Sequence, residues 1–190
     1  MRIVFLGPPG AGKGTQAMKI SVAHGLAHLS TGDILREEVD SESDLGCRVK
    51  DIMARGDLVP DDLVTNIIGT RVATPDCARG FVLDGFPRTL SQAEMLDEML
   101  MQKDMTLDAV IELNVNEEEL SNRIAGRTAE TQGDVRVDDS VEILRNRLAV
   151  YREQTLPLSG YYETRGLLRS VDGMAGIDEV NRQIEAVLGS

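Results

Sequence analysis

The stretch GPPGAGKGT, residues 7–15, is the feature that most constrains what this chain can fold into. A short apolar run, residues 1–6, precedes it and has the composition of a strand buried on both faces, while the segment after Lys13 has a helical pattern. Its glycines lack a Cβ, so the backbone can adopt positive φ and turn successive N–H groups toward an anion. The stretch therefore predicts a phosphate site between a strand and the N-terminus of a helix.

The glycines and the lysine in this stretch have the spacing G-x-x-x-x-G-K, which is the Walker A pattern. Lys13 adds a mobile positive charge for the outer phosphates of a nucleotide. We expect ATP to bind along the loop at Gly10, Ala11, Gly12, Lys13, Gly14 and Thr15.

The residue after Lys13 departs from the usual pattern. A Ser or Thr that holds Mg²⁺ is common there, whereas this chain has Gly14 followed by Thr15. The variant G-x-P-G-x-G-K-G-T resembles the nucleoside monophosphate kinases. That resemblance implies a metal held mostly by phosphates and water, which suits an ion that loses its waters reluctantly.

Length and charge limit the organisation and the partners. With 190 residues, 42% of them hydrophobic, the chain can build one sizeable core but not two domains of ordinary size. We expect one P-loop kinase domain, residues 1–190, with mobile insertions at 30–59 and 126–136. The net charge of −12 argues against nucleic acid or an anionic membrane as a partner.

Cysteine and the N-terminal residues point to a cytoplasmic protein. Cys47 and Cys77 form no C-x-x-C pair and no disulfide framework. The apolar start is broken at Gly7 and Pro8, far too early for a signal peptide or a membrane span.

Short apolar runs alternate with helical patterns along the chain, which predicts a parallel sheet wrapped in helices. We expect a strand at 27–30 and a mostly helical insertion at 31–59, capped by Thr31 or Asp33 and interrupted by a solvated turn at 40–44. Further strands are expected at 81–84, 107–113 and 167–171. The helical region from about 139 to 163 should be kinked or broken by Pro157, and a helix at 178–188 should close the fold.

The strand at 81–84 ends in Asp84 and is followed by Gly85, Phe86, Pro87 and Arg88. An acid and an arginine thus fall at the carboxyl end of a parallel strand, where ligands bind in open α/β sheets. We interpret Asp84 as the carboxylate that organises Mg²⁺ through water. The alternative is a turn or helix cap.

Three motifs in order, GxPGxGKGT, STGDxLR and LDGFPR, resemble those of the adenylate kinase family. The resemblance covers nearly the whole chain and continues through Gln92, Arg123 to Arg127, Arg136 to Asp139, Arg147 and Gly173. It implies reversible exchange, Mg·ATP + AMP giving Mg·ADP + ADP, on a three-layer α/β P-loop fold. The sheet should have five parallel strands in the order 2-3-1-4-5, with helices on both faces.

The arginines support this reading independently. Direct transfer between two nucleotides brings two polyanions together and must exclude water, so positive charges have to arrive from parts that can close. Arg123 and Arg127, four apart on one predicted helix, share a face, and a short polar loop separates Arg127 from Arg136. A plain solvated helix would also explain the first pair.

The resemblance assigns roles residue by residue. The loop between Arg127 and Arg136 would be the lid. Catalysis would use Lys13, Arg88, Arg123, Arg136 and Arg147. ATP would also contact Arg123, Arg127 and Gly173. AMP would be bound by Thr31, Gly32, Arg36, Asp57, Leu58, Val59, Gly85, Phe86, Pro87, Arg88, Gln92, Arg136 and Arg147.

Other groups carry weaker expectations. His24 and His28 favour surface or packing roles, and Asp33 and the pair Asp138 and Asp139 favour capping. Many adenylate kinases have a longer lid, in some with a Cys-rich zinc site, and this chain has neither. We expect Mg²⁺ as cofactor, no structural zinc, ATP, AMP and ADP as ligands, and a monomer.

Two alternatives stay open. A UMP/CMP kinase or another small-acceptor P-loop kinase would share the fold and differ in the acceptor insertion. A P-loop switch protein would share the Walker loop but would need no second arginine cluster.

Overall fold

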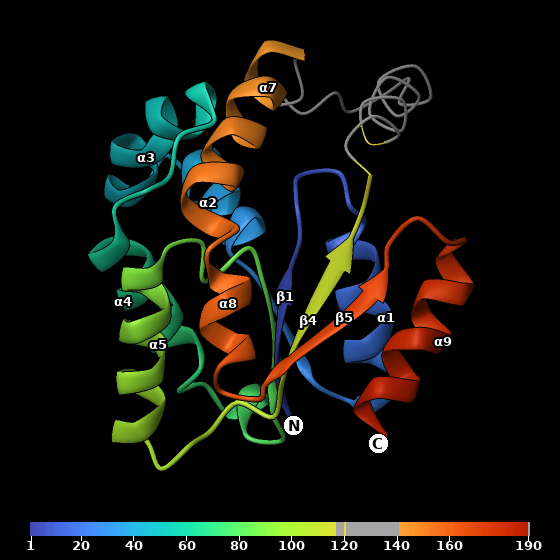
Figure 1. The fold of residues 1–190 in the computed structure, drawn as a ribbon. Helices are drawn as coiled ribbons and strands as arrows, with labels where there is room; N and C mark the ends of the chain where they lie inside the picture. The colour runs from blue at the N-terminus through green and yellow to red at the C-terminus, as the bar shows by residue number, and fades with distance from the viewer. Residues whose placement is uncertain (117–119, 121–140, 190) are drawn as a thin grey trace.

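The computed structural model describes residues 1–116, 120 and 141–189. Its centre is a sheet of five parallel strands in the order β2-β3-β1-β4-β5 (Figure 1), as predicted. The strands are β1 (Arg2–Leu6), β2 (Ala27–Ser30), β3 (Phe81–Asp84), β4 (Ala109–Asn114) and β5 (Leu168–Asp172). β4 and β5 begin one or two residues later than expected, and each ends one residue later.

Helices cover both faces of this sheet. α1 (Lys13–His24) and α9 (Ile177–Leu188) lie on one face, and α4 (Asp61–Arg71), α5 (Leu90–Gln102) and α8 (Leu158–Glu163) on the other (Figure 1). α2 (Thr31–Asp40), α3 (Asp44–Arg55) and α7 (Val141–Val150) gather beyond the carboxyl ends of the strands. A short 3-10 turn (Pro75–Cys77) precedes β3, and a π-helical turn (Tyr151–Thr155) links α7 to α8.

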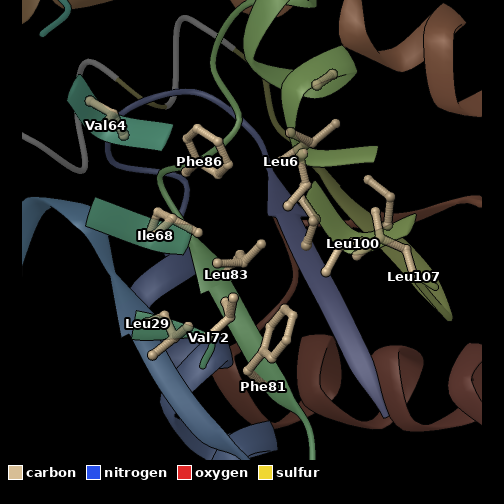
Figure 2. Close-up of a cluster of buried hydrophobic side chains, with 14 of the residues drawn as sticks. Leu6, Leu29, Val64, Ile68, Val72, Phe81, Leu83, Phe86, Leu100 and Leu107 are labelled. Carbon is tan, nitrogen blue, oxygen red and sulfur yellow. The ribbon is translucent and has the colours of Figure 1, made fainter. Parts of the chain in front are cut away.

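Alternating side chains of the strands divide the core into two layers. On β1, Ile3 and Phe5 pack in the layer under α1 and α9, whereas Val4 and Leu6 pack in the layer under α4, α5 and α8. Figure 2 shows part of the second layer, where Leu83 and Phe86 lie among side chains of the covering helices. All four of these β1 residues are at most 3% exposed. The buried sheet therefore provides a rigid base for the residues at its carboxyl edge.

Strand register brings three chain segments together at the carboxyl edge. Asp84, the last residue of β3, is paired with Phe5 of β1 and with Ser30 of β2. The residues that follow these strands, Gly7, Thr31 and Gly85, therefore leave the sheet at the same place. This edge is where parallel sheets bind ligands.

The cap of α2 differs from the expectation. Ser30, still in an extended conformation, accepts a hydrogen bond from the backbone N–H of Asp33 at 3.3 Å, so neither Thr31 nor Asp33 is the N-cap. The strand ends at Ser30 as expected, but the helix begins one residue earlier than capping by Thr31 requires, because Ser30 is both the last strand residue and the helix cap. The turn before α3 is also shorter than predicted, since α2 extends to Asp40 and Ser43 caps α3.

Pro157 breaks the long C-terminal helical region as predicted. It is the N-cap of α8, and one residue, Leu156, separates it from the π-helical turn. Within the described residues, no helix combines the length and the apolar composition needed to cross a membrane.

Candidate active site

The glycine-rich loop opens the N-terminus of α1 toward solvent. Gly10 has φ +83° and Gly12, the N-cap of α1, has φ +90°. Among the described residues no side chain caps this helix end, so its first N–H groups remain available to an anion. The loop thus has the backbone geometry that the sequence predicted for a phosphate site.

Lys13 folds back over this loop. Its Nζ donates to the carbonyl oxygens of Gly7 at 2.6 Å and Pro8 at 2.9 Å. The pKa of Lys13 is lowered to about 8, chiefly by burial; Asp84 opposes this shift, and the positive charges of Arg88 and Arg147 add to it. Three positive side chains predicted to handle phosphate therefore act on one another across a short space, which is unfavourable without an anion between them.

Asp84 lies beside the loop. A Cβ placed on Gly14 would be 3.3 Å from Asp84 Oδ2, and His28 Nε2 lies 3.8 Å from the same oxygen. The described residues contain no group of three or more His, Cys, Asp or Glu side chains arranged to hold a metal. A single carboxylate next to the phosphate loop fits a cation whose other ligands are phosphate oxygens and water, as Mg²⁺ prefers.

Arg88 is fixed by hydrogen bonds at three points. Its Nε donates to the carbonyl of Gly85 at 2.7 Å, its backbone N–H donates to Gln92 Oε1 at 2.7 Å, and its carbonyl accepts from Thr155 Oγ1 at 2.8 Å. Burial lowers the pKa of Arg88, Arg147 and Arg36 add to that, and Asp84 opposes it. An arginine stays charged under such shifts, so the guanidinium is a preorganised cation at the sheet edge.

A pocket lies between the insertion, the carboxyl edge and α7. Most of the residues predicted to bind AMP line it, together with Leu35, Met53, Gly56 and Val64, which the sequence analysis did not name. The predicted residues in the lining are Thr31, Gly32, Arg36, Asp57, Leu58, Val59, Gly85, Arg88, Gln92 and Arg147. The four additional residues supply mainly apolar surface, and the helical spacing of Leu35 and Val64 is the signal that could have identified them.

Two predicted residues do not line this pocket. Phe86 is fully buried in the core layer under α4 and α5 (Figure 2), and a cis peptide bond joins it to Pro87. Burial in the core explains Phe86 without a ligand. The predicted contacts of Phe86 and Pro87 with AMP therefore stay predictions.

Polar residues of the insertion make local contacts. Arg36 Nη2 donates to Asp33 Oδ1 at 2.5 Å, and Thr31 Oγ1 donates to the carbonyl of Asp84 at 3.2 Å. The first contact gives Asp33 a role other than the predicted cap. The second ties the start of α2 to the end of β3, which aligns the pocket with the loop.

Gly173 follows β5 and packs closely against β4. Its N–H donates to the carbonyl of Asn114 at 2.8 Å, and a Cβ there would lie 2.8 Å from Val115 Cγ1. Close packing thus explains the glycine, and its contact with ATP stays a prediction. Arg123, Arg127, Arg136, Asp138 and Asp139 lie outside the described residues, as does the predicted lid.

Comparison with known proteins gives one consistent result. A family model described as adenylate kinase matches residues 5–167. The adenylate kinase of Parvibaculum lavamentivorans is 56% identical over 189 residues, covering 100% of this chain and 92% of the relative. Those of Agrobacterium fabrum and Brucella ovis are 52% and 51% identical over 191 residues, covering 99% of this chain and 97% and 98% of the relatives. The family resemblance seen in the motifs is confirmed, and the chain belongs to the adenylate kinase family.

Proposed function

We propose that this protein catalyses Mg²⁺-dependent transfer of the terminal phosphoryl group of ATP to AMP, giving two ADP, and the reverse reaction. The observation that carries this proposal is the position of Arg88. It lines the acceptor pocket and also lowers the pKa of Lys13 in the neighbouring phosphate loop. One cation therefore lies at the acceptor pocket and close enough to act electrostatically on the phosphate loop.

The donor would bind along the glycine-rich loop. The open N–H groups at the start of α1 would hold its phosphates, and Lys13 would exchange the carbonyls of Gly7 and Pro8 for phosphate oxygens. Asp84 would hold Mg²⁺ through water, and the metal supplies charge neutralisation on the polyphosphate. Gly10, Ala11, Gly12, Gly14 and Thr15 complete this proposed ATP site, to which the family resemblance adds Gly173.

The acceptor would bind in the pocket next to the insertion. Arg36, Arg88 and Arg147 would neutralise the phosphate of AMP, because all three line the pocket and both Arg36 and Arg147 act electrostatically on Arg88. Transfer needs stabilisation of the charge on the moving phosphoryl group, and Lys13, Arg88 and Arg147 are placed to give it. From the family resemblance we assign Arg123 and Arg127 to ATP, and Arg136 to the transferred group, in a lid spanning 126–136.

The adenine base of AMP would be read by an amide. Gln92 lines the pocket and is 2% exposed, so a base that fails to pair with it leaves buried polar groups unsatisfied. Thr31 stands where the similar pyrimidine monophosphate kinases often have alanine. The amide and Thr31 favour AMP over a pyrimidine acceptor.

A panel of acceptors tests this assignment. With Mg·ATP fixed, we expect kcat/KM for AMP to exceed that for CMP, UMP and GMP by about a hundredfold or more, since mispairing in a buried polar site costs a few kcal/mol. Replacing Gln92 with Ala should raise KM for AMP and leave KM for ATP nearly unchanged. A preference for CMP or UMP would show that the pocket assignment is wrong while leaving the kinase assignment intact.

Location and assembly form the rest of the proposal. We propose a cytoplasmic monomer that needs no zinc, nucleic acid or membrane for its activity. Sedimentation of the purified protein tests the assembly state, and a concentration-independent mass of one chain is expected.

A further inference from the structure

The side-chain amide of Gln92 is held at both of its ends. Its Oε1 accepts from the backbone N–H of Arg88 at 2.7 Å, and its Nε2 donates to Asp61 Oδ1 at 2.7 Å. Asp61 is the first residue of α4, 31 positions away in the sequence, and α4 packs beside α5, which carries Gln92 (Figure 1).

The carboxylate of Asp61 is itself fixed in place. Its other oxygen, Oδ2, accepts from Thr89 Oγ1 at 3.0 Å. Thr89 caps α5 and accepts in turn from the backbone N–H of Gln92 at 3.1 Å. Asp61, Thr89 and Gln92 thus form a closed ring of three hydrogen bonds. The Asp61 carboxylate accepts twice, and the Thr89 hydroxyl donates to Asp61 and accepts from Gln92.

These partners allow one orientation of the amide. A backbone N–H can only donate and an ionised carboxylate can only accept. Rotating the amide by a half turn would set Oε1 against the Asp61 carboxylate and the NH₂ group against the Arg88 N–H, which breaks both bonds and adds repulsion. The side chain therefore keeps its oxygen toward Arg88 and its nitrogen toward α4.

The amide keeps hydrogen-bonding capacity for a ligand. Its oxygen has a second lone pair, its nitrogen has a second N–H, and the side chain lines the acceptor pocket. Adenine presents an acceptor at N1 and a donor at its 6-amino group. The 6-oxo base of inosine monophosphate (IMP) presents a donor and an acceptor at these two positions, so it would need the opposite orientation of the amide.

We propose that Asp61 is a positioning residue that locks the Gln92 amide in the orientation that selects a 6-amino purine over a 6-oxo purine. The inference rests on the proposed function and adds a residue outside the pocket lining as a determinant of specificity. Asp61 has a competing role, because an acid in the first turn of a helix also stabilises the helix dipole. Asp62, the next residue, is exposed in the same turn. It would stabilise the helix dipole as well but has no part in orienting Gln92.

The test is the ratio of kcat/KM for AMP to kcat/KM for IMP. In Asp61→Ala we expect this ratio to fall about tenfold or more, because only the Arg88 N–H then opposes the turned amide that serves the 6-oxo base. In Asp62→Ala, the matched control for the lost helix charge, the ratio should stay within about twofold of wild type. KM for ATP should be unchanged in both variants. Asp61→Asn, which keeps the shape but can accept or donate, should give an intermediate ratio and serves if the alanine variant does not fold.

A structural role for Asp61 would give a different result. Loosening of α4 would lower kcat/KM for AMP and IMP alike and leave their ratio at the wild-type value in both Asp61 variants, which would overturn the proposal. An equal fall of the ratio in the Asp62 control would overturn it as well. Failure of the wild-type enzyme to use AMP at all would instead refute the proposed function, so the two failures are distinguishable.

Discussion

Asn146 of α7 donates its side-chain amide to two acceptors at the C-terminal end of α3, the carbonyl of Arg55 at 2.8 Å and the carboxylate of Asp57 at 3.1 Å. Asp57 also accepts from Arg55 Nε at 2.9 Å, and the two bonds, that from Arg55 first, hold the pKa of Asp57 below its usual value. α7 carries Arg147 and the insertion carries Arg36, so the contact holds together two sides of the acceptor pocket.

Asn146→Asp should open this contact, because it sets a second carboxylate against Asp57 and the Arg55 carbonyl. We expect KM for AMP to rise about threefold to tenfold, a modest effect because the contact is exposed. Steady-state kinetics with each nucleotide varied would measure it. Asn66→Asp, the same change at an exposed position of α4, is the control and should leave KM unaltered; equal effects in both variants would count against the contact.

Gly85→Ala should disrupt the pocket. Gly85 has φ +83°, and a methyl group there would lie 2.7 Å from Thr31 Oγ1 and 3.0 Å from Arg88 Nη2. Since side chains rarely adopt this φ, and the Arg88 guanidinium would have to move, kcat/KM for AMP should fall by about a hundredfold, as it does elsewhere when a charge-stabilising donor is lost.

Gly160→Ala provides the control for that variant. Gly160 lies in α8, and a Cβ there would meet no described atom within 4 Å. Replacing a helical glycine by alanine should keep activity and raise the free energy of unfolding by roughly 0.5–1 kcal/mol. Normal kinetics in Gly85→Ala would mean that Arg88 is not held where the structure has it.

Lys13→Ala should mainly reduce turnover. In the proposed reaction this lysine stabilises the negative charge on the transferred phosphoryl group. Without it, kcat should fall by roughly two to three orders of magnitude. A folded variant with kcat within a few-fold of wild type would exclude that role.

The affinity for Mg·ATP should depend on pH through Lys13. Its pKa is lowered to about 8 in the free protein, and bound phosphates favour the protonated form, so binding raises that pKa. The affinity for Mg·ATP should therefore be highest below about pH 8, where Lys13 is protonated before binding. It should decline as the pH rises above about 8, because the free enzyme has then lost the proton. Binding measured from about pH 7 to about pH 9.5 should show this decline in wild type and not in Lys13→Arg, whose guanidinium does not titrate. A flat wild-type profile would contradict the lowered pKa.

Metal removal should separate magnesium from zinc. We expect chelation to abolish phosphoryl transfer, Mg²⁺ alone to restore it, and metal analysis of the purified protein to find no stoichiometric zinc. The short segment between Arg127 and Arg136 is the reason to expect no zinc. One tightly bound zinc per chain would contradict that expectation.

The fold was predictable because its signals are local. Continuous apolar runs such as the one in β1, and Gly12 at the start of α1, depend on neighbouring residues alone, and the strand order came with the family motifs. The N-cap of α2 was predicted wrongly because Ser30, Thr31 and Asp33 all have capping side chains, and the choice depends on where the helix begins.

The site was predictable where motif residues carry it and not where tertiary contacts do. Lys13, Arg88 and Gln92 stand in recognisable motifs. Asp61, Asn146 and Thr155 do not, because each acquires its role from a contact with a segment distant in sequence. The contacts of Asp61 and Asn146 exist only because α4 packs beside α5 and α7 packs beside the insertion.

Product analysis with and without AMP tests the central claim most directly. Purified protein, Mg²⁺ and ATP would be incubated with and without AMP, and ADP, AMP and inorganic phosphate measured over time. The account predicts rapid ADP formation that requires AMP, with two ADP formed for each AMP consumed and little phosphate released. Phosphate release from ATP at the same rate with or without AMP would contradict it and identify a nucleotide hydrolase instead.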